Sequence, residues 1–280
     1  MIMLDGKRVS AERLQIIKNR LHDVEYKPHL VTVLVGSDPG SQIYVKMKHT
    51  TCEEVGIRST RIDLPESTTT SSLLSVINDL NQDPQVNGIL VQLPLPQHIE
   101  TSVILSSVEP KKDIDGFNPL NQGLLISGNP GFIPCTPKGI MTLLKTYNIN
   151  VSGLDAVVIG RSTDVGRPMS ALLLLSDATV TICHSKTRNI EQKLMNADLI
   201  VSAVGKADFL KGSMIKEGTV VIDVGITRIE GKVHGDVEFD SVSKKAGALT
   251  PVPGGVGPMT ILSLIENTLL ASGLQSCIPV

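Results

Sequence analysis

Near its middle the chain reads Val157-Val158-Ile159-Gly160-Arg161-Ser162-Thr163-Asp164-Val165-Gly166-Arg167-Pro168. An apolar run, a glycine and a proline suited to a first helical turn predict a strand, a tight turn and a helix. Backbone N–H groups at such a helix start make a site for a pyrophosphate. Ser162 stands where a complete G-x-G-x-x-G pattern has its second glycine. An ordinary turn between a strand and a helix is therefore the alternative interpretation.

Short apolar runs alternate with amphipathic segments along the rest of the chain, which is typical of βαβ units and a mainly parallel sheet. We expect strands at residues 30–35, 57–64, 88–93, 156–159, 179–183, 199–204 and 219–224. We expect helices at residues 41–55, 71–81, 137–147, 168–175, 190–196 and 259–270. The fold class is therefore α/β.

Two Gly- and Pro-rich stretches divide the chain, because each one interrupts the series of strands and helices. Residues 111–137 precede a fresh series, and residues 250–258 separate that series from a last helix. We expect a first α/β domain over residues 1–137, with the C-terminal helix, residues 258–280, packing back on it. A Rossmann-like domain is expected over residues 138–257.

Composition excludes several classes of function. The formal net charge of −2 argues against a nucleic-acid partner, and the 2% of aromatic residues leaves little material for stacking bases. The four cysteines are spread along the chain without a CxxC or a His/Cys cluster, so no zinc site or disulfide framework is expected. Neither a signal peptide nor an apolar run of about 18–20 residues is visible, so we expect a cytoplasmic protein without a membrane partner.

The strand expected at residues 179–183 ends in His184-Ser185-Lys186-Thr187, without an acid. In NAD-binding domains an Asp or Glu at this end bonds the ribose 2′-hydroxyl, whereas Asp177 lies at the opposite end of the strand. A cation at Arg161 and a hydroxyl at Ser185 suit a 2′-phosphate instead, through charge-assisted hydrogen bonds. NADP is therefore favoured over NAD, with solvated loop residues as the alternative.

The first domain carries a second group of polar residues. Tyr44 and Lys48 are four residues apart on an expected helix and so share one face. Gln92 lies near the end of an apolar strand, where ligand crevices open in parallel sheets. Asp113 and Asp115 precede a glycine, and one carboxylate can accept both N–H donors of an amino-pyrimidinone edge. A surface Tyr–Lys pair, an exposed strand end and an ordinary loop are the alternatives.

Taken in order, these motifs closely resemble those of the bifunctional methylenetetrahydrofolate dehydrogenase/methenyltetrahydrofolate cyclohydrolase family, and the likeness covers nearly the full chain. The segments that carry it are Tyr44-x-x-x-Lys48, Val91-Gln92-Leu93-Pro94, Lys112-Asp113-Ile114-Asp115-Gly116, Pro134-Cys135-Thr136-Pro137, Gly160-Arg161-Ser162, His184-Ser185, Val221-Ile222-Asp223-Val224-Gly225 and Thr250-Pro251-Val252-Pro253-Gly254-Gly255-Val256-Gly257-Pro258.

This resemblance implies an NADP-dependent enzyme that oxidises 5,10-methylenetetrahydrofolate and hydrolyses the methenyl product to 10-formyltetrahydrofolate. It further implies a cytoplasmic homodimer that serves one-carbon metabolism and purine biosynthesis, with the folate cleft between a catalytic domain and an NADP domain. It implies no metal.

Carried over position by position, the resemblance makes Lys48 the catalytic lysine and Gln92 its partner. It implies that Tyr44 lines the cleft against the aromatic ring of the folate, while Asp115 holds the pterin edge. Substrate contacts are further implied at Pro253, Gly254 and Gly255. Cofactor contacts are implied at Gly160, Arg161, Ser162, Ser185, Val204, Gly205 and Ile226.

Two positions depart from the family pattern. Asp164 stands where the family usually has an apolar residue, and a carboxylate near a pyrophosphate weakens cofactor binding. Ala207 stands where proline is common, which loosens a loop but removes no chemical group.

The expected chemistry is hydride transfer by positioning, followed by hydrolysis with Lys48 as base or proton shuttle. A partly desolvated lysine beside a cationic substrate gives up its proton more readily. Two rival classes are a dehydrogenase of the same build with another small substrate, and a non-catalytic NADP sensor. The motifs at Gln92 and Asp115 speak against the first rival, and the presence of Lys48 speaks against the second.

Overall fold

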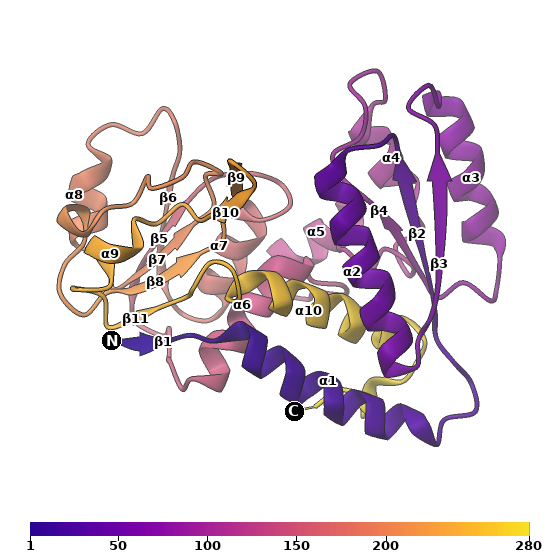
Figure 1. The fold of residues 1–280 in the computed structure, drawn as a ribbon, viewed down its shortest axis with the longest axis horizontal. Helices are drawn as coiled ribbons and strands as arrows, with labels where there is room; N and C mark the ends of the chain where they lie inside the picture. The colour runs from indigo at the N-terminus through magenta and orange to yellow at the C-terminus, as the bar shows by residue number, and fades with distance from the viewer. Residues whose placement is uncertain (280) are drawn as a thin grey trace. The chain divides into compact units, whose positions relative to one another are not determined.

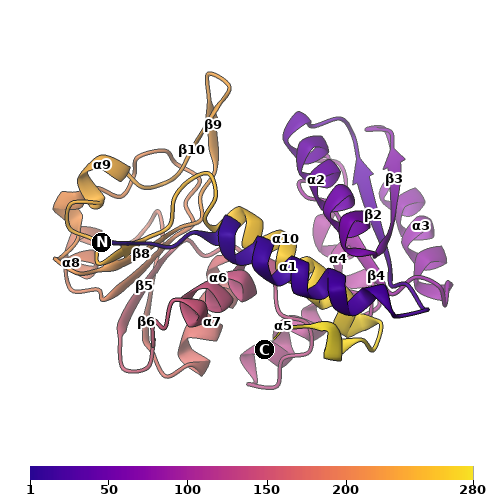
Figure 2. The ribbon, with the colours of Figure 1, turned by 60° about the horizontal axis from the view of Figure 1, so that its bottom comes forward.

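The structure, a computed structural model, describes residues 1–279 and divides into two compact units. The six-stranded unit comprises Met1–Ala11 and Thr136–Thr260, and the three-stranded unit comprises Glu12–Cys135 and the residues from Ile261 onward. In both units helices cover the two faces of a parallel sheet (Figures 1 and 2). The expected two-domain α/β fold class is therefore confirmed.

The three-stranded sheet has the order β3-β2-β4, with parallel pairing throughout. Alternate side chains of its central strand point to opposite faces. One face, which includes Val31 and Val33, packs with Leu73 and Ile104 in the core beneath α3 and α4. Helix α2 covers the other face (Figure 1). The elements are α2 (Pro39–Val55), α3 (Thr70–Gln82), α4 (Thr101–Ser107), β2 (His29–Val35), β3 (Arg58–Leu64) and β4 (Gly88–Val91).

The last helix, α10 (Val256–Ala271), contributes its residues from Ile261 onward to the three-stranded unit. Asn267 Nδ2 donates to the carbonyl oxygens of Ile114 (2.7 Å) and Ile133 (2.9 Å). These bonds join α10 to the segments that follow α4 and residue 126 of the same unit, so the expectation that this helix packs back on the first domain is confirmed.

The six-stranded sheet has the order β1-β11-β8-β7-β5-β6, and every pair in it is parallel. Because β5 lies between β6 and β7, the strand order reverses there, and a crevice opens outside the carboxyl ends of the strands. The strands are β1 (Ile2–Met3), β5 (Asp155–Ile159), β6 (Thr179–Cys183), β7 (Leu199–Ser202), β8 (Val220–Asp223) and β11 (Ala248–Leu249). Around them lie α6 (Cys135–Thr146), α7 (Gly166–Leu175), α8 (Ile190–Met195), α9 (Phe239–Val242) and the hairpin β9 (Thr227–Ile229) with β10 (Lys232–His234).

The start of the chain belongs to the six-stranded sheet, whereas the expected first domain began at residue 1. Ile2 pairs with Ala248 and Met3 with Leu249. The amide of Leu4 also donates to Leu249 O at 2.9 Å. This pairing places Met1–Ala11 in the six-stranded unit.

Within residues 1–279, four α-helices lie outside the expected set: α1 (Gly6–His22), α4, α5 (Pro119–Ile126) and the short α9. Helix α5 forms within residues 111–137, where we expected few regular elements. Asn118 caps it by accepting the Leu120 amide at 2.8 Å, and Pro119 suits its first turn. Every helix within residues 1–279 is too short or too polar to span a lipid bilayer.

Candidate active site

Three predicted site residues meet on the α2 side of the three-stranded sheet. Lys48 Nζ donates to Gln92 Oε1 at 3.2 Å and lies 4.6 Å from the centre of the Tyr44 ring. Tyr44 and Lys48 are one turn apart on α2, and Gln92 directly follows β4. Val91 belongs to the core beneath α3 and α4, so the next side chain points to the opposite face, toward α2.

The side-chain amide of Gln92 is held in one orientation. Its Nε2 donates to Leu93 O at 2.6 Å, which leaves Oε1 to accept the Lys48 ammonium. Lys48 is only 5% exposed, so the alternative of an ordinary surface Tyr–Lys pair does not fit. The arrangement fixes a buried amino group beside an aromatic face.

Cys52 lies one turn beyond Lys48 on α2. Burial raises the pKa of the Cys52 thiol to about 12, an effect that the nearby Lys48 charge opposes. The thiol is therefore neutral near pH 7 and supplies no negative charge to the lysine. Within residues 1–279 no carboxylate forms an ion pair with Lys48. A neutral amide and a ring face hold the charge instead.

The charged residues that precede Gly116 have separate roles. Lys112 Nζ donates to the carbonyl oxygens of Leu80, Asn81 and Asp83 at 2.9, 2.8 and 2.6 Å, which satisfies the end of α3. Lys112 is thus a structural residue of this loop.

Asp113 is also structural. Its buried carboxylate accepts the amides of Phe117 (3.1 Å) and Asn118 (2.8 Å) and Nδ2 of Asn121 (2.8 Å). Burial raises the pKa of Asp113, and these hydrogen bonds oppose the rise. Asp115 is half-buried and has no side-chain partner within residues 1–279. Of the two acids, only Asp115 is therefore available to a ligand.

The predicted cofactor positions all follow carboxyl ends of strands in the six-stranded sheet. Residues 160–162 follow β5, Ser185 follows β6, Val204 and Gly205 follow β7, and Ile226 follows β8. Because the strands are parallel, these ends share one edge of the sheet. Val204 is 41% and Ile226 is 58% exposed, so two apolar side chains at this edge remain uncovered.

The turn after β5 is tight, as expected, and its own serine side chain bonds the start of α7. Gly160 has φ +129, and a Cβ there would lie 2.5 Å from Ala203 O. Ser162 Oγ accepts the amides of Val165 and Gly166, each at 3.3 Å. We expected these helix-start amides to be open to a pyrophosphate, whereas the serine hydroxyl occupies two of them. Ser162 keeps its own hydroxyl hydrogen to donate.

The two residues predicted to select NADP lie on neighbouring strand ends. Ile159 pairs with Cys183 in the register of β5 and β6. Arg161 and Ser185 each lie two residues beyond that pair, and both are exposed. No acid follows β6 before residue 191, and Asp177 precedes this strand. A cation and a hydroxyl thus lie at neighbouring strand ends, and their contact with a 2′-phosphate stays a prediction.

The predicted substrate residues Pro253, Gly254 and Gly255 follow β11 at the same edge. The Lys7 amide donates to Gly254 O at 2.8 Å, and Gly255 is buried at the start of α10. Their contact with substrate stays a prediction.

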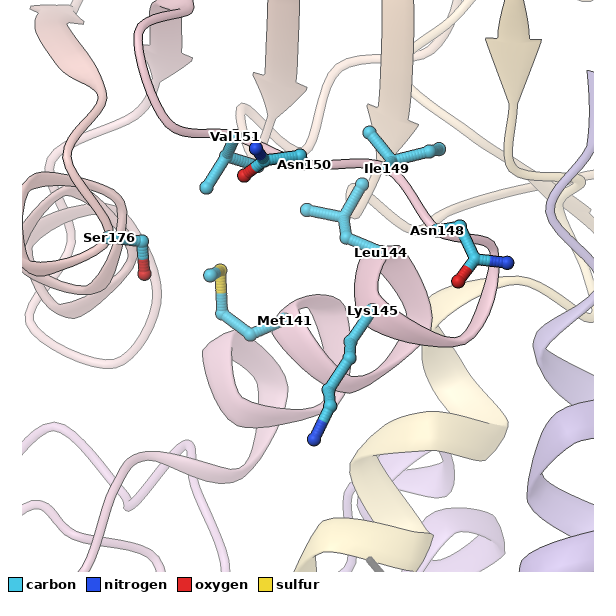
Figure 3. Close-up of a pocket in the computed structure, with 8 residues that line it drawn as sticks. All are labelled: Met141, Leu144, Lys145, Asn148, Ile149, Asn150, Val151 and Ser176. Atoms are coloured by element: carbon cyan, nitrogen blue, oxygen red, sulfur yellow. The ribbon is translucent and has the colours of Figure 1, made fainter.

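A hollow of about 430 Å³ lies elsewhere in the six-stranded unit (Figure 3). Met141 and Leu144 of α6 line it together with residues 148–151, which precede β5. It therefore opens near the amino ends of the strands and contains none of the predicted site residues. Within residues 1–279 no three His, Cys, Asp or Glu side chains gather to hold a metal ion.

Comparison with known proteins matches both parts of the chain to one family. Residues 4–115 match the catalytic domain of tetrahydrofolate dehydrogenase/cyclohydrolase, and residues 134–276 match its NAD(P)-binding domain. The bifunctional protein FolD of Methanoculleus marisnigri is 56% identical over 277 residues, which cover 99% of this chain and 98% of that protein.

Solved structures agree. The bifunctional methylenetetrahydrofolate dehydrogenase/cyclohydrolase FolD from Campylobacter jejuni is 50% identical with a TM-score of 0.95, covering 98% of this chain and 99% of that one. The Trypanosoma brucei dehydrogenase–cyclohydrolase, solved with NADP and an inhibitor, is 36% identical with a TM-score of 0.93 and 97% coverage of both chains. The resemblance read from the sequence is confirmed, and the chain belongs to the tetrahydrofolate dehydrogenase/cyclohydrolase family.

Proposed function

We propose that this chain oxidises 5,10-methylenetetrahydrofolate with NADP and hydrolyses the resulting methenyl form to 10-formyltetrahydrofolate. The observation that carries the proposal is the buried Lys48–Gln92 contact beside the Tyr44 ring. In the same unit Asp115 offers a carboxylate with no side-chain partner within residues 1–279. One amino group for proton transfer and one carboxylate for the pterin edge are the two groups that the reactions need.

The dehydrogenase step depends on positioning. NADP held by Arg161 and Ser185 would supply the hydride acceptor for the one-carbon unit, whose two flanking nitrogens stabilise the cation that forms. The chain holds the pterin edge at Asp115 and supports the aromatic ring at Tyr44. Oriented binding of this kind contributes as much as ~7–11 kcal/mol in favourable cases.

The hydrolytic step moves protons through Lys48. Water adds to the methenyl carbon, and the amine form of Lys48 Nζ accepts one proton from it. Nζ then delivers that proton to the N5 nitrogen as the carbon–N5 bond breaks. The second proton of the water is released to solvent as the formyl carbonyl forms, so the reaction balances. Gln92 Oε1, 3.2 Å from Nζ, orients the amine throughout.

The residues at the carboxyl edge of the six-stranded sheet suit NADP. Gly160 lets the turn after β5 lie directly against the backbone of Ala203, where a Cβ would collide with Ala203 O. Arg161 and Ser185 supply the charge and the hydroxyl for a 2′-phosphate. The exposed side chains of Val204 and Ile226 give the rings of the cofactor apolar surface to cover.

Asp164, half-buried in the turn after β5, opposes this binding. Its carboxylate repels a pyrophosphate held at the same turn, and both NADP and NAD carry that group. Asp164→Ile should therefore lower the KM for both cofactors by a similar factor. A change confined to NADP would mean that Asp164 acts at the 2′-phosphate.

We further propose that the enzyme is a cytoplasmic homodimer whose product supplies formyl groups for purine biosynthesis. Leu174 and Leu175 on α7 and Ile182 on the edge strand β6 are large exposed apolar residues of one unit, and they support self-association there. Light scattering should give twice the mass of 30.0 kDa per chain. Leu174→Lys should weaken that dimer.

The direct test is an absorbance assay of purified protein with methylenetetrahydrofolate and either NADP or NAD. We expect NADP reduction together with a methenyl intermediate that the enzyme then consumes. Turnover of a shikimate- or amino-acid-type substrate instead would identify another dehydrogenase. Binding of NADP without turnover of any substrate would identify a sensor.

A further inference from the structure

A buried carboxylate lies beneath the loop that follows β7. Asp236 is 0% exposed and accepts three hydrogen bonds from this region. Its Oδ2 accepts the amide of Val204 at 2.6 Å and Oγ of Ser202 at 3.1 Å. Its Oδ1 accepts the amide of Lys206 at 2.8 Å. One side chain therefore spans the loop on both sides of Gly205.

Packing does little to hold the same loop. Val204, Gly205 and Lys206 are all exposed, and a Cβ placed on Gly205 would meet no atom within 4 Å. The hydrogen bonds to Asp236 thus determine where these backbone atoms lie. Within residues 203–206, the position of Val204 depends on this carboxylate more than on neighbouring side chains.

Asp236 is itself held by a second buried carboxylate, at the end of β8. Asp223 Oδ1 accepts the Asp236 amide at 2.8 Å, and Asp223 Oδ2 accepts the Val237 amide at 3.0 Å. The Asp223 amide donates to Thr250 Oγ1 at 2.7 Å, at the start of the run that follows β11. Loops after three neighbouring strands, β7, β8 and β11, are thereby joined in one buried network.

The surrounding backbone leaves room for these carboxylates. A Cβ on Gly225 would collide with the Asp236 carboxylate, and one on Gly235 would collide with that of Asp223. Both glycines therefore permit the close approach that the network requires. Burial, together with the nearby Asp236 charge, raises the pKa of Asp223 to about 7, although hydrogen bonds to its carboxylate oppose the rise.

We propose that Asp236 is a positioning residue for the dinucleotide: it holds the Val204–Lys206 loop in the geometry that binds NADP. The inference rests on the proposed cofactor site, in which Val204 and Gly205 contact NADP. Asp236 touches neither cofactor nor substrate, since it is fully buried, and acts only through the backbone amides that it accepts.

The test compares Asp236→Asn with a matched control, Asp198→Asn. Asn has nearly the shape of Asp but places an NH2 group against a backbone N–H donor, so one bond to the loop is lost. Asp198 also accepts a backbone amide, that of Asp155 at 2.9 Å, but at the opposite end of the same sheet. The readouts are the KM and Kd for NADP, the kcat at saturating NADP, and methenyl hydrolysis assayed without NADP.

We expect Asp236→Asn to raise the KM and Kd for NADP about tenfold, the equivalent of roughly 1.4 kcal/mol. The kcat at saturating NADP and the rate of hydrolysis should change by less than about twofold, because neither depends on cofactor affinity. Asp198→Asn should leave all four quantities unchanged. An unchanged KM for NADP in Asp236→Asn, or equal losses of both activities, would overturn the proposal.

Two further variants complete the design. Ser202→Ala removes one donor to Asp236 but keeps the carboxylate, so it should raise the KM for NADP by a smaller factor of about three. If Asp236→Asn does not fold, Ser202→Ala tests the proposal in its place. An unchanged KM for NADP in Ser202→Ala would then overturn the proposal. Val204→Asp tests the cofactor site itself. If Val204→Asp binds NADP normally, the cofactor placement fails; if it binds poorly while Asp236→Asn binds normally, only the role of Asp236 fails.

Discussion

Gln92→Glu should stop hydrolysis by holding Lys48 in its ammonium form. The substitution keeps the shape of the side chain but places a carboxylate where Oε1 now lies, 3.2 Å from Nζ. At that separation and an effective dielectric constant of about 20, the attraction between unit charges is about 5 kcal/mol. If desolvation of the new carboxylate offsets half of this, about 2.5 kcal/mol remains, which makes the amine form roughly 50 to 100 times scarcer.

The second oxygen of the new carboxylate would face Leu93 O, to which Nε2 now donates at 2.6 Å. Loss of that bond and the repulsion between the two oxygens should lower the free energy of unfolding by about 1–3 kcal/mol. Urea unfolding measures this cost separately from the kinetics. The matched control is Gln97→Glu, which makes the same chemical change at an exposed position in the same segment.

The assay follows the loss of methenyltetrahydrofolate absorbance, and NADP reduction is measured on the same preparation. We expect hydrolysis by Gln92→Glu to fall at least about 50-fold, while NADP reduction, which needs no amine, falls much less. Gln97→Glu should match the unmodified enzyme in both. Hydrolysis by Gln92→Glu within twofold of the unmodified rate would refute the role of Lys48 as proton carrier.

Four more outcomes can be checked. Lys48→Met should abolish hydrolysis while NADP binding, measured by fluorescence titration, persists; hydrolysis at the normal rate contradicts the assignment. Asp115→Asn places an NH2 donor opposite the N–H donors of the pterin. Because an unpaired buried polar group costs about 1–3 kcal/mol, steady-state kinetics should show a several-fold higher KM for the folate substrate; an unchanged KM would contradict the role of Asp115. Arg161→Ala should raise the KM for NADP about tenfold and that for NAD far less; equal effects would exclude a 2′-phosphate contact. Because burial raises the pKa of Asp223 to about 7, the folded state keeps a proton that the unfolded state has lost above about pH 4. The free energy of unfolding therefore falls as the pH rises, by about 1.4 kcal/mol between about pH 6 and pH 8. Urea unfolding of the Asp223→Asn variant should not show this fall.

The longer strands could be predicted from two patterns: β2 is buried throughout and is mostly apolar, whereas the edge strand β6 alternates Thr with Val and Ile. Strand β6 lies where residues 179–183 predicted it, and β2 differs from its predicted range by one residue. Strands β1 and β11 could not be found in this way, because each has two residues and their pairing joins the two ends of the chain. Helix α1 could have been predicted from the sequence, because its buried residues Val9, Ile17 and Leu21 follow one another at helical spacings of eight and four residues.

The site residues, like the strands, could be predicted only where the signal is local in the sequence. Helical spacing puts Tyr44 beside Lys48, and the position of Gln92 after an apolar strand puts it at the ligand-binding edge, so local rules were enough for these residues. No local rule separates Asp113 from Asp115, because the difference lies in which carboxylate the amides of residues 117 and 118 reach. The role of Asp236 could not be predicted for a similar reason, because the donors to its carboxylate precede it by about thirty residues.

The pairing of β1 with β11 affects how the chain can be synthesised and divided. On a ribosome, Ile2 and Met3 emerge long before Ala248 and Leu249, and they must wait for these residues before they can join the sheet. A fragment cut at Thr136 and Thr260 would lack β1 and would leave the edge of β11 open to strands of other molecules. An excised cofactor-binding domain should therefore carry residues 1–11 through a linker, and a fragment without them should aggregate more readily.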